Sequence, residues 1–584
     1  MKNRIKQYLL AASMCVGLTA CSDFFEPIPG VQFGLDETFA SKQRTEEYLN
    51  NVYSYVREVT DAIHPNTYGG IFTEASLDGA NRWNKTYAEW TNGSFNSASA
   101  QASEYFSKYY QAIAKASTFI QNVDKCTEAA ASTRGKWKSE ARALRAYYYF
   151  ELLRLYGPIP LIGEDPIPLD ASLEELIKER NSVDECVNFI ATELQSAIDS
   201  GDLLQRAGKA NLGRMDVATC MALKAKLYLY WASPLFNGNT DQASVKNKDG
   251  RQLFPQTEDN SKWTQARDAY ERFMTFATGQ GYKLTEVYTN GKLDPYASCR
   301  AAGEFFTTTW EAVDELIFVK LRDLYDYTYW VCPKFTDFQD TDVTGGGGYY
   351  TTQETVDLFF TKDGLTIEED PGYDKFEGIP SANNFTSGRY YDPNNPSRLY
   401  FDADKSKVLK QWKDREPRFY VNITYSGSIW LNEGKYNEEM RTDFTNGANG
   451  TCGKSKASGD CPDSGYLIRR GAKASNNNGS KHFSPVLRLA DMYLGYAEAL
   501  CMCSDLDNAL TYLNKIRVRA GIPEYTFTAT AGKITCPKTQ TDLLNRIRRE
   551  RLVELVFEWN RYFDVRRWKV AEGQNDPEHW IYPA

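Results

Sequence analysis

The chain has 584 residues and a formal net charge of −9 at pH 7. An acidic chain argues against nucleic acid or an anionic lipid surface as its partner, because both repel negative protein surfaces. Only three histidines are present, far apart in the sequence, so a histidine-based metal site has little to build on. Aromatic residues make up 14% of the chain, and Tyr and Trp serve both helix packing and sugar stacking.

The N-terminus is typical of a secretory signal peptide. Basic residues precede an apolar run over residues 8–16, which is too short for a membrane-spanning helix. The sequence Leu-Thr-Ala-Cys at 18–21 resembles the lipobox of bacterial lipoproteins, in which cleavage before the cysteine leaves its sulfur to carry diacylglycerol. We therefore expect residues 1–20 to be removed and a lipidated Cys21 to anchor the mature chain. The alternative is an ordinary secreted protein with a cysteine at this place.

Helical periodicity accounts for most of the mature chain. From Trp137 to Leu155 the large apolar residues and alanines recur every three or four positions, which indicates one buried helix face, and the pattern stops at Gly157 and Pro158. Helices of similar spacing are predicted over residues 36–60, 99–125, 173–200, 213–233, 262–279, 487–503, 506–520 and 541–569. The mature chain is therefore predicted to be mainly α.

One helix pair has the length of a known repeat. The two helices predicted over residues 487–520 span 34 residues, which is the tetratricopeptide period. Residues 262–279 give a further helix of the same character. Because each helix pair leaves one apolar face open, we expect a tetratricopeptide-like helical superhelix built from segments distant in the sequence.

Between about 280 and 485 the periodicity gives way to Gly, Asn, Asp, Ser and aromatic residues, with one further helix predicted over 353–360. A run of this length inside a compact domain is usually functional. We interpret it as a loop-rich, aromatic-rich subdomain that lies over a helical scaffold of about 36–280 and 486–570. Since no linker divides the two parts, residues 21–584 are predicted to form a single unit.

The 12 cysteines are scattered along the chain and do not form a disulfide framework. Cys452 and Cys461 lie in a loop rich in Gly, Ser and Asn, and whether they close a small ring in an oxidising compartment stays open. Cys501 and Cys503 are two apart on a predicted helix, so they do not face each other.

Several stretches resemble one bacterial family, in order along the chain. They are Ala-Arg-Ala-Leu-Arg-Ala-Tyr-Tyr-Tyr-Phe at 141–150, Tyr-Gly-Pro-Ile-Pro-Leu at 156–161, Leu-Arg-Leu-Ala-Asp at 487–491, Leu-Asn-Lys-Ile-Arg-Val-Arg-Ala-Gly at 513–521, Glu-Arg-Leu-Val-Glu-Leu at 550–555 and Arg-Tyr-Phe-Asp-Val-Arg-Arg-Trp at 561–568. With the lipobox, they are similar to the SusD/RagB family of surface glycan-binding lipoproteins in Bacteroidetes nutrient-uptake systems. Trp559 departs from the family pattern, which has a small residue there.

The resemblance implies a SusD-like fold and a protein with neither catalytic activity nor a cofactor. It implies an outer-membrane lipoprotein, facing the cell exterior, that binds an oligosaccharide or polysaccharide. It further implies that a SusC-like TonB-dependent barrel transporter receives the glycan. The shared motifs belong to the scaffold rather than to the binding site, so they do not identify the glycan.

The charges of the C-terminal helix have three interpretations. Arg551 and Glu554, like Glu558 and Arg561, are three apart and can pair on one helix face. A nucleic-acid patch is disfavoured, because the interleaved glutamates cancel much of its positive field. Glycosidase carboxylates are disfavoured too, because the arginine neighbours favour ion pairing.

The first candidate binding region is an early polar loop. A glycan site needs a flat aromatic face for the C–H side of a sugar and polar groups for its hydroxyls. Trp83 lies among such groups, and members of the similar family often place a binding aromatic in the corresponding early loop. Trp83 is therefore a candidate platform, and a packing tryptophan is the alternative. The polar candidates around it are Asp78, Asn81 and Arg82.

The second candidate region lies in the loop-rich segment. Three tyrosines alternate from Tyr325 to position 329, which would place them on one face of an extended segment. The alternative is a buried strand face. The candidate glycan-binding residues here are Tyr327, Tyr329, Trp330 and Tyr349, and those of a third, weaker cluster are Arg389 and Tyr390.

A metal site is not predicted. Asp340 and Asp342 occupy the first and third places of half a calcium loop, with Gly345 at the sixth. The twelfth place is Thr351, where a bidentate glutamate is expected. Glycines 345–348 are no phosphate loop, because the Gly-Lys-Ser/Thr sequence is missing.

Two other classes of function compete with a glycan-binding protein. A surface-tethered glycoside hydrolase on a helical scaffold would need two acidic side chains in a cleft, and no signature isolates such a pair. A structural repeat protein that docks other proteins leaves the aromatic polar loops without a purpose. Non-catalytic binding of a surface glycan is therefore the leading hypothesis.

Overall fold

The structure is a computed structural model, and it describes most of the chain. The described residues are 34–57, 71–76, 78–82, 96, 99–163, 171–303, 313–322, 325–335, 345–376, 378–430, 440–444, 452, 460–472 and 482–570. They are mainly α-helical, as predicted. Within them, no helix combines the length and the apolar composition needed to cross a membrane.

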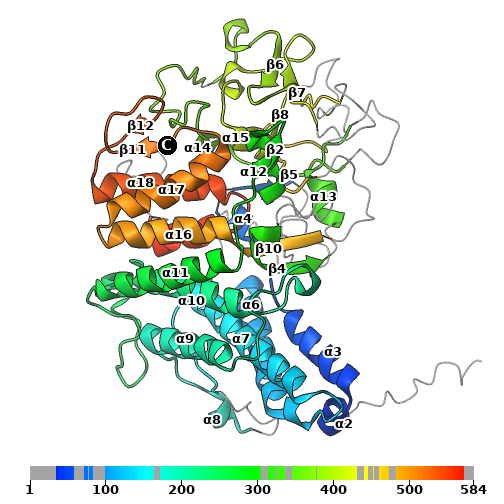
Figure 1. The fold of residues 1–584 in the computed structure, drawn as a ribbon, viewed down its shortest axis with the longest axis vertical. Helices are drawn as coiled ribbons and strands as arrows, with labels where there is room; N and C mark the ends of the chain where they lie inside the picture. Colours follow the sequence, from blue (N-terminus) through cyan, green and yellow to red (C-terminus); the bar gives the residue numbers. More distant parts are fainter. Residues whose placement is uncertain are drawn as a thin grey trace, which may run out of the picture.

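The N-terminal half is a stack of long helices, each packed on the next (Figure 1). In chain order they are α6 (Ala100–Asn122), α7 (Ala131–Tyr156), α9 (Val183–Asp199), α10 (Val217–Ala232) and α11 (Ser261–Gly279). Two shorter helices, α2 (Leu35–Ala40) and α3 (Lys42–Tyr53), lie at the start of the stack, where α3 contacts α6 and α7. The helix α7 ends at Gly157, whose φ of 71° no longer suits a right-handed helix, as predicted.

The stack continues into the C-terminal part of the chain. The helix α11 packs against α16 (Leu489–Met502), which in turn contacts α17 (Leu506–Ala520) and α18 (Gln540–Glu554). More than two hundred residues separate α11 from α16 in the sequence, yet Figure 1 shows them as adjacent layers. This confirms the expected superhelix of paired helices from segments distant in the sequence.

Three helices that were predicted to be continuous are broken. The described part of 36–60 forms α2 and α3, which are separated at Ser41. Residues 173–200 form α8 (Leu173–Leu176) and α9, because the Ser182 side chain accepts a hydrogen bond from the Glu185 N–H and the Glu185 carboxylate accepts one from the Ser182 N–H. This capping box starts a new helix. Residues 541–569 form α18 and α19 (Asn560–Arg567), because Trp559 between them has a φ of 64°.

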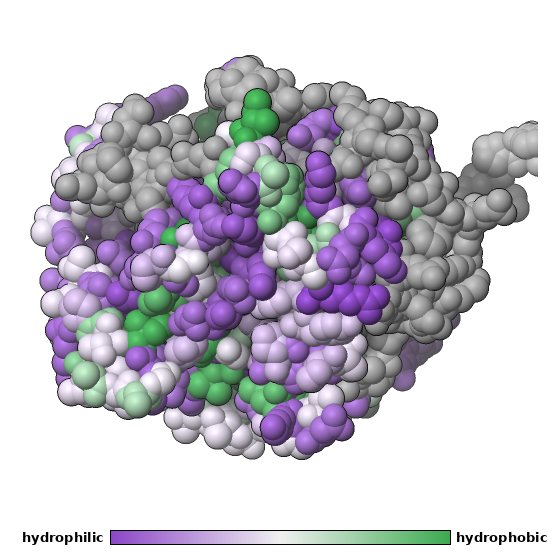
Figure 2. All heavy atoms as spheres, turned by 90° about the horizontal axis from the view of Figure 1, so that it is seen from above, coloured by the Kyte–Doolittle hydropathy of each residue, from purple (hydrophilic) through white to green (hydrophobic). Residues whose placement is uncertain are grey.

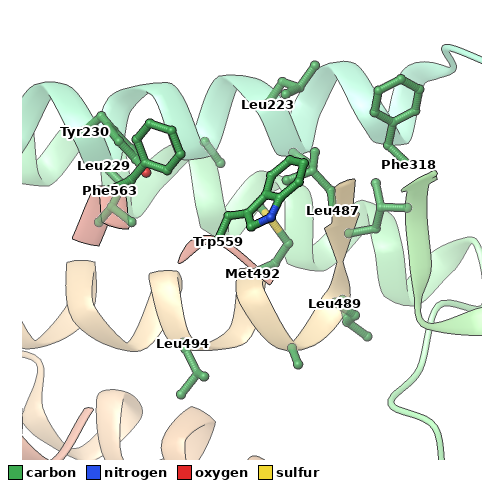
Figure 3. Packing of buried hydrophobic residues seen from close by; sticks show 14 of the residues in the cluster. Leu223, Leu229, Tyr230, Phe318, Leu487, Leu489, Met492, Leu494, Trp559 and Phe563 are labelled. Carbon is green, nitrogen blue, oxygen red and sulfur yellow. The ribbon is translucent and has the colours of Figure 1, made fainter. Parts of the chain in front are cut away.

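The core lies where α10, α16 and the C-terminal segment meet (Figure 3). Leu223 on α10 and Met492 on α16 point into this space, and Phe318 and Leu487 close one side of it. The last two residues belong to the antiparallel pair of β4 (Leu316–Arg322) and β10 (His482–Arg488), which ties the loop-rich segment to the scaffold. Trp559 is buried in this core, so a large residue fills the place where the family pattern expects a small one.

Buried ion pairs connect the C-terminal helices to one another. The Arg488 guanidinium contacts Glu315 at 2.7 Å and Glu554 at 2.8 Å. Arg519 pairs with the same two glutamates, and Arg418 reaches Glu554 at 3.2 Å. Each charge is compensated, which a buried charge requires.

Ion pairing of the C-terminal charges is therefore correct, but the predicted partners are wrong. Arg551 pairs with Asp564 at 2.6 Å rather than with Glu554. Glu558 pairs with Arg488 at 2.9 Å rather than with Arg561. The helix break around Trp559 is one reason, because it takes residues 558 and 561 off a common helix face. The other reason is that arginines from distant elements offer buried partners.

The described part of 280–485 consists of short elements. The helices are α12 (Pro295–Gly303), α13 (Tyr325–Val331), α14 (Gln353–Leu358) and α15 (Pro417–Asn422); the strands besides β4 are β2 (Tyr288–Thr289), β3 (Lys292–Leu293), β5 (Tyr349–Tyr350), β6 (Arg389–Asp392), β7 (Asn395–Asp402), β8 (Ile423–Tyr425) and β9 (Tyr466–Ile468). Outside this range lie α4 (Ile71–Glu74), β1 (Ala80–Asn81), β11 (Tyr525–Thr526) and β12 (Ile534–Thr535). A four-stranded sheet runs in the order β1-β5-β9-β8 and thus joins the early loop to this segment.

Candidate functional site

The sheet brings two of the predicted binding regions together. Strands β1 and β5 are antiparallel, and Asn81 lies opposite Tyr349. The Arg82 N–H donates to the carbonyl of Gly348 at 2.9 Å, which extends the contact beyond the strands. The early polar loop and the aromatic segment, far apart in the sequence, therefore form one surface region.

The aromatic segment is helical, which corrects the prediction of an extended one. Residues Tyr325–Val331 form α13, so the three tyrosines do not share a face. Tyr327 is buried, and its hydroxyl donates to the carbonyl of Arg470 at 2.8 Å. Tyr329 and Trp330 are only half-buried, with their rings perpendicular at 5.3 Å between centroids.

Glycines 346 and 348 form hydrogen bonds with the C-terminal end of this helix. The N–H groups of Gly346 and Gly348 donate to the carbonyls of Tyr329 at 2.8 Å and Trp330 at 3.1 Å, which satisfies the carbonyl end of α13. A Cβ at Gly346 would lie 2.7 Å from the Tyr329 ring and 2.8 Å from the Trp330 ring. Glycine is therefore needed at position 346, because a side chain there would collide with the rings of Tyr329 and Trp330. The alternation of the tyrosines had indicated an extended segment, and that indication was wrong.

Four of the predicted contacts are packing residues. Tyr349 is buried, and the Tyr327 ring meets it edge-on at 6.0 Å. Asn81 is buried too. Asp78 is buried against Arg561 of α19 at 3.1 Å, and burial raises the pKa of Asp78 although Arg561 opposes that effect. These side chains hold the region in place rather than facing a ligand.

Arg82, Tyr329 and Trp330 are the predicted residues that keep accessible surface in this region. Arg82 pairs with Asp463 and donates to the carbonyl of Cys461 at 3.3 Å. The pair places a guanidinium and a half-exposed carboxylate near Tyr350 of β5. Such polar groups around aromatic rings suit the hydroxyls and the C–H faces of a sugar.

The third predicted cluster lies elsewhere, on the β6–β7 hairpin at the top of Figure 1. Arg389 is exposed and pairs with Asp402 at 3.1 Å. Tyr390 stacks on Phe401 at 5.2 Å between centroids, and its hydroxyl donates to Asp414 at 3.1 Å. The hairpin does not join Tyr329 and Trp330.

Several predictions fall outside the described residues and stay predictions. Trp83 is among them, as are the lipidated Cys21 and the calcium-loop residues Asp340 and Asp342. Among the residues that are described, no group of His, Cys, Asp and Glu side chains is arranged to hold a metal ion. Cys452 and Cys461 are both buried, and a bridge between them stays open.

A cavity near the hairpin was missed at the sequence level. It has a volume of about 270 Å³ and lies among α12, β7, α15 and β8. Its aromatic walls are Tyr296, Tyr400, Tyr420, Tyr425 and Trp430. These residues come from separate short elements, so no local motif marks them. The density of tyrosines between 390 and 425 was the one available signal.

Comparison with known proteins supports this architecture. Residues 315–579 match the model of the SusD family, and residues 32–229 match a model described as starch-binding associating with outer membrane. A SusD-like protein of Bacteroides ovatus is 27% identical over 175 residues, and this match covers 29% of the chain and only 30% of that relative.

Solved structures extend the comparison over nearly the whole chain. The protein named BT4246 is 25% identical and superposes with a TM-score of 0.69, covering 91% of this chain and 89% of that one. A SusD-like carbohydrate binding protein of Bacteroides fragilis is 19% identical, with a TM-score of 0.60 over 92% of this chain and 88% of that one. The fold defines a helical-repeat scaffold with an inserted loop-rich segment. The chain belongs to the SusD/RagB family.

Proposed function

We propose that the chain is a non-catalytic glycan-binding lipoprotein on the outer surface of an outer membrane. In this proposal it binds an oligosaccharide or polysaccharide and delivers it to a SusC-like TonB-dependent barrel transporter. The main supporting observation is the β1–β5 pairing, which joins the early loop to the strand Tyr349–Tyr350. Gly348, just before that strand, accepts a hydrogen bond from the Arg82 N–H and donates one to the carbonyl of Trp330, so the backbone connects the early loop to the aromatic helix.

The energetics of such a region suit weak, repeated contacts with sugar rings. Covering about 80 Å² of aromatic ring face contributes roughly 2 kcal/mol, which corresponds to about 30-fold in affinity. One ring therefore supports weak binding, and successive sugars strengthen it. Figure 2 shows that polar residues cover most of the described surface at the β6–β7 end, with apolar residues in small separate patches. A hydroxyl-rich ligand suits this face.

The competing glycoside hydrolase would need an accessible pair of carboxylates. The carboxylates of Glu550, Glu554 and Glu558 in the C-terminal segment are the candidates for this role, and all three are shielded from solvent and paired with arginines. The pKa of Glu554 lies well below its ordinary value, because Arg519, Arg488 and Arg418 outweigh the raising effect of burial. A general acid needs the opposite shift. Binding without hydrolysis is therefore the better proposal.

The location and the partner rest on the family resemblance and on Cys21. A lipid-anchored protein that holds glycans outside the cell needs a route for their import, which a barrel transporter supplies. Extraction in mild detergent should co-purify such a barrel, whereas the lone chain would count against delivery. Cys21→Ala should leave the membrane fraction, since acyl chains supply the attachment.

Affinity electrophoresis across a panel of polysaccharides tests the binding itself. The wild type should be retarded by at least one of them without releasing product. Trp83→Ala and Trp330→Ala should each weaken the affinity at least tenfold, since one stacked face contributes roughly 2 kcal/mol. Phe527→Ala is the matched control, because it removes a half-buried ring beyond β11. Product release would favour the hydrolase, and no retardation by any polysaccharide would contradict glycan binding.

A further inference from the structure

Positively charged side chains line the cavity near the β6–β7 hairpin. The arginines are Arg300, Arg398 and Arg469. Arg398 is compensated, because it contacts Asp294 at 2.8 Å and Asp392 at 2.6 Å. Arg469 differs from Arg398 in its partners, and it determines whether a ligand would meet an uncompensated charge.

Arg469 has no acidic partner among the described residues. Its Nη1 donates to the carbonyl of Ile429 at 3.0 Å, and its guanidinium lies 5.6 Å from the centroid of the Trp430 ring. The residue is only 8% exposed. Burial lowers the pKa of Arg469, Tyr296 opposes this effect through its charge and a hydrogen bond, and the nearby charge of Arg300 lowers the pKa further.

A buried guanidinium normally has a carboxylate beside it, as the scaffold arginines do. Removing a cation from water without an anion is costly, and a second guanidinium nearby adds repulsion. The cavity next to Arg469 leaves space for the missing anion to come from a ligand. Arg398 and Arg488, in contrast, each contact a carboxylate of the protein itself.

The walls of the cavity suit a sugar ring. Tyr400 and Tyr420 stack with 3.9 Å between centroids and an interplanar angle of 11°. Tyr425 is buried, and its hydroxyl finds no hydrogen-bond partner among the described residues. That hydroxyl can bond to a ligand, and the flat rings can cover a C–H face.

The volume limits the size of the ligand. Sites for small molecules usually measure about 300–1,000 Å³. At about 270 Å³ the cavity lies just below this range, so it suits one sugar ring rather than a long segment of a glycan.

We infer that this cavity binds one acidic sugar unit, a hexuronate, with its carboxylate beside Arg469 and Arg300 and its ring against the tyrosine walls. The inference rests on the proposed glycan-binding function and adds a charged subsite separate from Tyr329 and Trp330. A glycan that carries hexuronate units would contact both places, and a neutral glycan would contact only the aromatic region.

The test compares matched sugars and matched variants by calorimetry. D-galacturonate and D-glucuronate should bind the wild type at least tenfold more tightly than D-galactose and D-glucose. Arg469→Gln should abolish this difference. Arg251→Gln should preserve it, because Arg251 is an exposed arginine of the N-terminal half, pairs with Glu185 at 3.2 Å and does not line the cavity. D-galactose 6-sulfate carries a sulfate in place of the carboxylate, so its binding shows whether the cavity prefers a carboxylate to another oxyanion.

Equal binding of the uronates and the neutral hexoses to the wild type, or unchanged uronate binding by Arg469→Gln, overturns the inference. So does a preference for the sulfated sugar with no preference for the uronates. If Arg469→Gln fails to fold, Tyr425→Phe removes one hydroxyl only, and it should weaken uronate binding several-fold. Retardation by neutral polysaccharides with no uronate preference would leave the proposed function standing and refute this subsite alone.

Discussion

Buried arginines of the helical scaffold and Arg469 of the loop-rich segment differ in whether a carboxylate contacts them. In the scaffold, Arg488 and Arg519 each contact two glutamates, Glu315 and Glu554, from separate elements. In the loop-rich segment, the neighbours of the Arg469 guanidinium include a backbone carbonyl, the Trp430 ring and Tyr296, but no carboxylate of the described residues. Both regions bury cations and supply anions to them, as Asp294 does for Arg398, but Arg469 contacts no carboxylate among the described residues.

The difference separates groups that hold the fold from groups left for a ligand. A compensated charge network fixes how the helices pack, because removing one partner leaves the other as an uncompensated buried charge, which destabilises the fold. An uncompensated cation beside a cavity contributes little to the fold and much to recognition. The comparison predicts that carboxylate substitutions affect stability strongly in the scaffold and weakly around the aromatic region.

Glu554→Gln should have the largest effect. Arg418, Arg488 and Arg519 all contact this carboxylate, so its neutralisation leaves three buried cations with less compensation. We expect a loss of about 3–5 kcal/mol in the free energy of unfolding, measured by urea denaturation at pH 7. A loss below about 1 kcal/mol would contradict the idea that this network holds the helices together.

The pH dependence sharpens this prediction. The folded-state pKa of Glu554 is depressed, because the three arginines outweigh the raising effect of burial. A depressed carboxylate stabilises the fold above its unfolded-state pKa of about 4.3, and this contribution is lost as the pH falls below that value. The difference between wild type and Glu554→Gln should therefore shrink on acidification from pH 7 to pH 3.

The scaffold was largely predictable from the sequence, and the ion partners were not. Helical spacing places α7 and its end at Gly157 correctly, because local periodicity and a helix-stopping residue act within a few turns. The partner of Arg551 is Asp564 across a helix break, and spacing alone cannot reveal such a contact. Pairing between distant elements depends on the assembled fold.

The candidate site was predictable only in part. Clustering of polar and aromatic residues identified Arg82, Tyr329 and Trp330, which the structure leaves accessible. The same rule also selected Tyr327 and Asp78, which are buried, because composition does not distinguish a packing tyrosine from an exposed one. No local pattern could locate the cavity, since its walls come from separate short elements.

Glu74→Gln should have an intermediate effect of opposite sign. Burial raises the pKa of Glu74 to about 8, so the folded state keeps a proton that the unfolded state loses near pH 4.3. Stability therefore falls as the pH rises between these two values. At pH 8 the glutamine variant should be more stable than the wild type by roughly 2–4 kcal/mol.

Thermal melting at two pH values tests this prediction. The midpoint of Glu74→Gln should exceed that of the wild type at pH 8, and the two should nearly coincide at pH 4.5. Since the Glu554 prediction runs the other way with pH, the two variants act as controls for each other. A glutamine variant that is destabilised equally at both pH values would contradict the prediction that Glu74 is protonated in the folded state.

Asp463→Asn should have the smallest effect on stability. Asp463 pairs with Arg82, but its side chain is 51% exposed, and an ion pair in contact with water contributes at most about 1 kcal/mol. The thermal midpoint should therefore stay close to that of the wild type. Binding should respond more strongly, because the carboxylate holds the Arg82 guanidinium near Tyr350, in the region proposed to bind the glycan. We expect retardation by the preferred polysaccharide to weaken several-fold while urea denaturation is nearly unchanged. If Asp463→Asn instead destabilises the fold as much as Glu554→Gln does, the contrast between a structural network and a ligand-facing pair fails. If it changes neither property, Arg82 takes no part in binding, and Tyr329 and Trp330 must hold the glycan without it.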